Sequence, residues 1–97
     1  MTDDLDTETL AFAHRMFDLA RAGETEELSG HVEAGLPVNM TNDRGDTLLV
    51  LAAYHAHPAT VAALLARGAD PAHGNPSALE TARFFDLPQM LTLLTSR

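Results

Sequence analysis

The chain contains no cysteine, lysine, isoleucine or tryptophan, and its only aromatic residues besides histidine are one tyrosine and four phenylalanines. Without cysteine it can form no disulfide, no thiol nucleophile and no cysteine-ligated metal site. We therefore expect a reducing, cytoplasmic compartment. All six basic residues are arginine. This bias, with abundant alanine and leucine, indicates GC-rich coding and favours a bacterial source.

Long apolar runs are also missing. No stretch of 18 apolar residues occurs in the 97-residue chain, so we expect no transmembrane helix. The N-terminus is acidic and has no basic region ahead of an apolar stretch, which argues against a signal peptide. The length predicts a single domain.

Positive charge is scarce, and the net charge is −8. Residues 1–33 carry nine acidic residues and two arginines, a net −7, whereas residues 34–97 carry five acidic residues and four arginines, a net −1. Such a charge argues against nucleic-acid or anionic-membrane binding. It permits a basic protein partner.

Catalytic and metal-binding motifs are absent from the sequence. There is no glycine-rich phosphate loop and no G-x-S-x-G motif, so we expect no enzyme activity and no cofactor. His55 and His57 flank Ala56, but no third ligand converges on them in the sequence pattern, and no metal site is expected. His31 falls on the apolar side of its predicted helix, where burial would make it pH-sensitive.

The most regular stretch is residues 47–70, which predicts two short helices. Thr47 is a good N-cap ahead of an apolar run. Pro58 suits the first turn of a second helix, and Leu64 lies on its apolar stripe. Gly68 is the expected left-handed C-cap. Helices this short are marginal alone, so neighbouring repeats are expected.

A repeat does follow from the spacing, because Gly35 and Gly68 lie 33 residues apart. Residues 47–52 (T-L-L-V-L-A) and residues 64–70 (L-L-A-R-G-A-D) resemble the opening and closing motifs of the ankyrin repeat. The resemblance covers about residues 11–97, with one good repeat between two divergent ones. The last repeat aligns with the central one at an offset of 30 residues instead of 33, so the loop before it is three residues shorter than the ankyrin pattern.

The resemblance implies an all-α ankyrin-repeat solenoid of three stacked helix pairs with short finger loops. We expect an acidic flexible terminus over residues 1–9 and a single repeat domain over residues 10–97. The repeats are expected at about residues 10–41, 42–74 and 75–97. Terminal repeats are expected to be atypical, because each has one face in water.

In ankyrin proteins the concave groove and the finger tips bind partners, so the resemblance implies a set of candidate partner-binding residues. These are Met40, Thr41, Asp43, Arg44, Asp46, Tyr54, His55, Phe84 and Phe85. Phe84 and Phe85 cannot both face one core, so we expect one to pack and the other to remain in the groove beside Tyr54. The alternative is that both rings are buried as a C-terminal cap. Arg83 replaces Ala53 at a normally close-packed site, which predicts altered stacking.

Three interpretations of function follow. The first is a non-catalytic protein-binding module. The second is an acidic inhibitor or immunity-type protein that caps a basic enzyme surface, with Glu24, Glu26 and Glu27 as contacts. These three acidic residues also interact favourably with the dipole at a helix N-terminus, which explains them without any partner. The third is a homo-oligomeric building block.

Overall fold

Six helices make up the regular structure of residues 2–96, which the computed structural model describes, with side chains described from residue 7 onward. In chain order they are α1 (Thr2–Ala22), α2 (Thr25–Glu33), α3 (Leu48–Tyr54), α4 (Pro58–Ala66), α5 (Ala78–Phe84) and α6 (Pro88–Thr95). Two isolated antiparallel bridges, Thr41 with Thr47 and Gly74 with Ser77, close the loops that precede α3 and α5.

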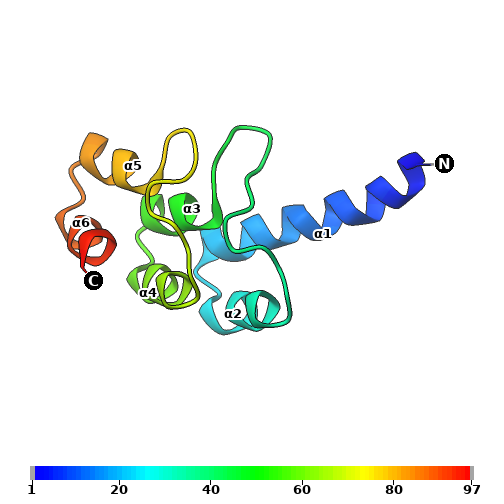
Figure 1. Cartoon of the computed structure of the whole chain (residues 1–97), viewed down its shortest axis with the longest axis horizontal. Coiled ribbons are helices and arrows are strands. Elements are labelled where there is room, and N and C mark those ends of the chain that lie inside the picture. The colour runs from blue at the N-terminus through cyan, green and yellow to red at the C-terminus, as the bar shows by residue number, and fades with distance from the viewer. Residues whose placement is uncertain (1, 97) are drawn as a thin grey trace.

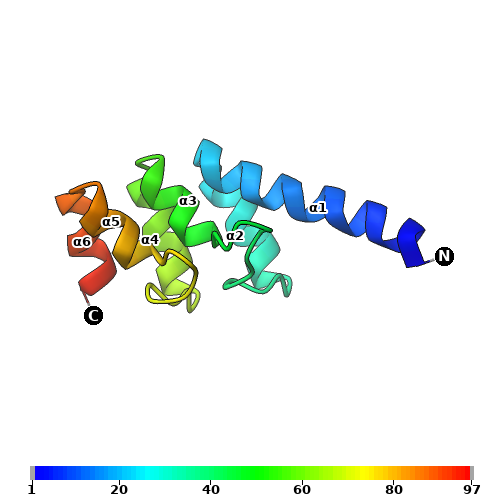
Figure 2. The same cartoon turned by 90° about the horizontal axis from the view of Figure 1, so that it is seen from above.

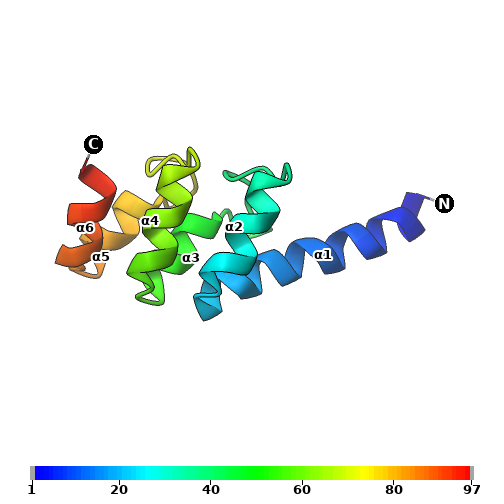
Figure 3. The ribbon, with the colours of Figure 1, turned by 90° about the horizontal axis from the view of Figure 1, so that it is seen from below.

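The helices form three pairs that stack along the long axis of the molecule (Figure 1). α1, α3 and α5 make one layer, and α2, α4 and α6 lie side by side in the other (Figures 2 and 3). Stacking in line gives an elongated shape of 46 × 24 × 20 Å. The prediction of an all-α solenoid with three helix pairs and short finger loops is confirmed.

Local sequence explains where the short helices begin. The Thr47 hydroxyl accepts a hydrogen bond from the Val50 amide at 3.1 Å, as an N-cap should. Ser77 caps α5 in the same way, and the Glu80 carboxylate in turn accepts a hydrogen bond from the Ser77 amide. Pro58 opens α4, where its missing amide hydrogen costs nothing.

α1 is the exception to the repeat pattern, because it has 21 residues where α3 and α5 have seven each. The apolar pattern predicts a helix from Leu10, but α1 begins at Thr2, and its first half projects beyond the stack (Figure 1). Acidic residues early in a helix interact favourably with its dipole, which is consistent with this extension. The flexibility expected of residues 1–9 stays a prediction.

The C-terminal end of the stack is polar. Val50 and Ala53 of α3 are buried, whereas the residues at the equivalent positions of α5, Glu80 and Arg83, are exposed. These positions face the following helix pair, and no described helix covers them in α5. Arg83 therefore does not crowd a packed site, and the altered stacking predicted from it is wrong.

The N-terminal end is polar for the same reason. Leu48 and Leu51 of α3 are buried, whereas Arg15 and Asp18, their equivalents in α1, are exposed. These positions face the preceding pair, and the described chain has none before α1. At these positions of both end helices, charged side chains thus replace apolar ones because no helix covers the face.

Polar contacts join the first and second pairs. The His57 Nε2–H donates to the Arg21 carbonyl oxygen at 2.7 Å, and the hydroxyls of Thr25 and Thr60 lie 2.6 Å apart. Gly23, between α1 and α2, has φ +74°, and a β-carbon added there would lie 2.5 Å from the His57 Nδ1. The ring has this position only because Gly23 has no side chain.

Within residues 2–96, no helix combines the length and the apolar character that crossing a membrane requires. In the same part of the chain, no three His, Asp or Glu side chains lie close enough together to hold a metal ion. His31 is half-buried, and its ring meets the edge of the Phe12 ring with centroids 5.4 Å apart. The buried His31 that the sequence predicts is therefore only partly realised.

Candidate functional site

A groove runs along one side of the stack, between α1, α3 and α5 and the two finger loops, residues 40–46 and 72–76. It consists of three adjoining hollows of about 390, 360 and 530 Å³. The first two share Arg21 and Arg44, and the last two share Pro76, Thr81 and Phe85. The hollows therefore form a continuous surface that reaches from the first helix pair to the third.

Three aromatic rings line the C-terminal part of the groove, and we call Tyr54, Phe84 and Phe85 the aromatic cluster. The Phe85 ring centroid lies 5.0 Å from that of Tyr54 and 4.9 Å from that of Phe84, both in edge-to-face geometry. Tyr54 is 50% exposed, Phe84 81% and Phe85 48%. Phe85 is thus the ring that contacts the second repeat, and Phe84 points into solvent.

The hypothesis that both phenylalanines are buried as a C-terminal cap is wrong. They lie at the end of α5, where no described helix stacks on the far side and the preceding finger loop is short. Burial would need a further element at this place, so the rings remain on the surface.

The first finger loop presents Asp43, Arg44 and Asp46 at the rim of the groove. The Asn42 side-chain oxygen accepts hydrogen bonds from the amides of Arg44 at 2.9 Å and Asp46 at 3.0 Å. Gly45, with φ +83°, lets the loop turn there and approach the second finger. The Asn75 amide donates to the Gly45 carbonyl oxygen at 3.0 Å, so the two fingers support each other.

No protein-family profile matches the chain. A 65-residue region, 63% of the chain, is 51% identical to a Pseudomonas aeruginosa (strain PAO1) protein named "Putative ankyrin repeat protein". Over this region the chain is similar to an ankyrin repeat protein, in agreement with its three stacked helix pairs. The matched region spans 38% of the relative's length, and the relative is bacterial, in agreement with the composition. The ankyrin family implies a protein–protein interaction module.

The remaining predicted residues lie at different places relative to the groove. His55 lines it, with its ring 5.0 Å from that of Tyr54. Met40 is half-buried against the hydrophobic core, and Thr41 is exposed at the bridge to Thr47, so neither lines the three hollows. All nine assignments stay predictions. Seven of these residues line the continuous surface of the three hollows, and Phe84 belongs to it because it lines the third hollow.

The structure also adds residues to the site that the sequence prediction omits, chiefly Arg21 and Pro76. The 33-residue ankyrin period aligns Arg21 with Tyr54, so the period did contain the signal for this residue. No comparable signal existed for Pro76, because the last repeat is out of register by three residues.

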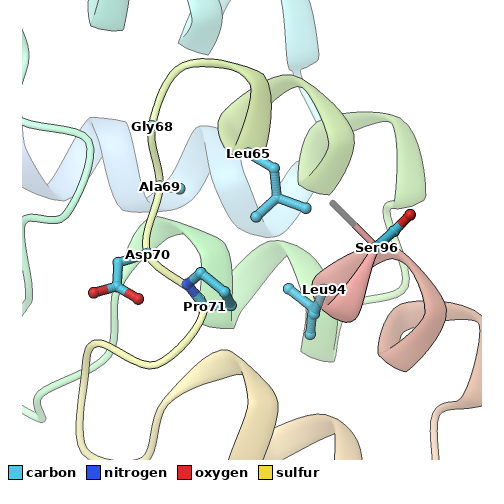
Figure 4. A pocket seen from close by; sticks show the side chains of 7 residues that line it. All are labelled: Leu65, Gly68, Ala69, Asp70, Pro71, Leu94 and Ser96. Carbon is cyan, nitrogen blue, oxygen red and sulfur yellow. The ribbon is translucent and has the colours of Figure 1, made fainter.

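A separate hollow of about 460 Å³ lies on another part of the surface, between α4, its return loop and α6 (Figure 4). Leu65 and Leu94 point into it from the two helices, whereas the Asp70 carboxylate is turned away from them. With one carboxylate and no cation in its lining, it offers no recognisable chemistry.

Proposed function

We propose that the chain is a non-catalytic binding module whose protein partner lies in the groove and contacts the finger tips. The observation that supports this most is the aromatic cluster, which is exposed although its rings contact one another. Leaving large apolar rings in water is unfavourable, and such patches on soluble proteins usually mark contact sites. Tyrosine and phenylalanine also bury much area while losing little conformational entropy, so they are effective interface anchors.

Replacing Phe85 with alanine is expected to weaken partner binding by about tenfold or more, as for an interface anchor. The fold should tolerate the change, because the ring is half-exposed and contacts mainly Tyr54 and Phe84. The measurement is affinity capture from the source organism with mass spectrometry, followed by titration calorimetry of the captured protein with wild type and variant.

Phe12→Ala is the matched control. Phe12 is 45% exposed, close to Phe85 at 48%, but it lies against His31 away from the groove. It should leave affinity within about twofold of wild type, as a residue outside the contact would. Equal effects of the two substitutions, or a loss of binding that tracks a loss of stability, would count against the groove.

The inhibitor interpretation predicts a different surface. Glu24, Glu26 and Glu27 belong to the start of α2, in the layer opposite the groove-lining helices (Figure 3), and Glu27 is already paired with Arg15. A basic partner there would compete with an internal ion pair. No observation favours this second function over the first.

Neutralising these three glutamates with glutamine is expected to change the affinity for the captured partner by less than about twofold. Binding should also weaken less steeply with salt than a contact through three glutamates would, because apolar contacts in the groove are not screened. Stopped-flow association rates across a salt series measure both effects. Slower association in the variant, with steep weakening by salt in wild type, would instead support the acidic inhibitor.

The absence of catalysis and of a cofactor, the cytoplasmic location and the exclusion of nucleic-acid and membrane partners stay predictions. The net charge of −8 supports the last of them, since both of those partners are anionic. A homo-oligomeric role also stays open to test by light scattering.

A further inference from the structure

The arginines of this acidic protein differ in whether they form ion pairs. Arg15 and Arg67 form ion pairs with glutamates of α2, and the Arg67 Nη2 lies 2.6 Å from the Glu33 carboxylate. Arg21 is bonded to Asp18 at 2.8 Å. Among the described residues, Arg44 and Arg83 have no ion pair, and of these two only Arg44 lines the groove.

The backbone that carries Arg44 is held firmly. The Asn42 side chain binds the amides on both sides of Gly45, and the Gly45 carbonyl is bonded to the second finger. A β-carbon on Gly45 would come 3.0 Å from the Asn75 carbonyl oxygen, which shows how closely the fingers pack. Binding therefore needs to order only the Arg44 side chain, and this lowers the entropic cost of a contact there.

Arg44 and the aromatic cluster meet in the central hollow of the groove. This hollow of about 360 Å³ is lined by Arg44 and Arg21 and also by Tyr54 and Phe85. Its lining contains one carboxylate, Asp46, which forms no ion pair with Arg44.

The other charged side chains near the hollow form no ion pair with Arg44. Asp18 is bonded to Arg21. Asp43 lines the neighbouring hollow together with Arg44, but it forms no ion pair with Arg44. Arg44 is thus the cation of the groove that no side chain neutralises, in a chain with a net charge of −8.

We propose that the groove binds a partner segment that presents a carboxylate to Arg44 and an apolar side chain to Tyr54 and Phe85. The proposal rests on the groove being the binding surface. A guanidinium binds a carboxylate through two parallel hydrogen bonds, which gives both energy and orientation. A basic segment would leave Arg44 facing a like charge. The partner is therefore acidic at the point of contact, although the protein as a whole is acidic.

The test uses short random peptides displayed on phage, selected against the full chain. Individual peptides are then synthesised, and their Kd values are measured by fluorescence anisotropy. We expect enrichment of Asp or Glu adjacent, or nearly adjacent, to Leu, Met or Phe. Arg44→Gln should weaken the selected peptides by about fivefold or more, as expected for loss of a charge-assisted bond. Arg83→Gln, which removes the other unpaired arginine outside the groove, should change Kd by less than about twofold.

Several results would overturn the proposal. Peptides that Phe85→Ala weakens but Arg44→Gln does not, or selected sequences rich in Lys and Arg, would refute the acidic partner while the groove remains the binding surface. Failure to recover any peptide that Phe85→Ala weakens would refute both. A dimer seen by light scattering and abolished by Phe85→Ala would make a second copy of this chain the occupant instead.

Discussion

Replacing Leu64 with alanine is expected to lower the free energy of unfolding by about 2–4 kcal/mol, the usual cost of truncating a buried leucine. Leu64 is 1% exposed and belongs to α4, which contacts α2, α3 and α6. The resulting cavity would lie in the central pair, on which both outer pairs stack. Since a short array depends on neighbour contacts, much of the chain should unfold together.

Chemical denaturation followed by circular dichroism measures this effect. Leu10→Ala is the control, because Leu10 is 55% exposed on α1 and should change stability by no more than about 0.5 kcal/mol. A loss below about 0.5 kcal/mol for Leu64→Ala would contradict the assignment of Leu64 to the core.

Gly23→Ala is expected to cost about 2–3 kcal/mol, from two causes that add. The residue has φ +74°, where a β-carbon is strained by about 1–2 kcal/mol. The new carbon would also lie 2.5 Å from the His57 Nδ1. The ring must then move, and its hydrogen bond to the Arg21 carbonyl oxygen, worth about 1 kcal/mol, is lost.

Gly30→Ala separates these causes from the general effect of adding a methyl group. Gly30 lies inside α2, its φ is not positive, and an added β-carbon would meet nothing within 4 Å. This substitution should stabilise the chain by about 0.5–1 kcal/mol, because alanine is the better helix former. If thermal unfolding showed Gly23→Ala to be as stable as wild type, the packing of His57 on Gly23 would be refuted.

Local signals were sufficient for most of the fold. Thr47 and Pro58 predicted the starts of α3 and α4, and Gly68 predicted the end of α4. These predictions succeeded because capping and proline geometry act within one helical turn and need no knowledge of the neighbours. The period of 33 residues then extended the pattern to a stack.

For the candidate site, the sequence predicted some of the residues that line the groove and missed others. Gly45 predicted the finger turn, and the resemblance to ankyrin repeats placed its neighbours Asp43, Arg44 and Asp46 at the edge of the groove. Arg21 was omitted, although the same period aligns it with Tyr54, and it lines two of the three hollows.

The sequence by itself therefore determined where the short helices α3 and α4 begin, the repeat and the resemblance to the ankyrin family. Only the tertiary structure decided which side chains are covered. One of Phe84 and Phe85 was expected to pack and Arg83 was placed at a normally close-packed site, yet all three side chains are exposed. The physical reason is that burial depends on whether another element lies over a given face. Helical periodicity specifies the direction of a side chain and carries no information about what it meets there.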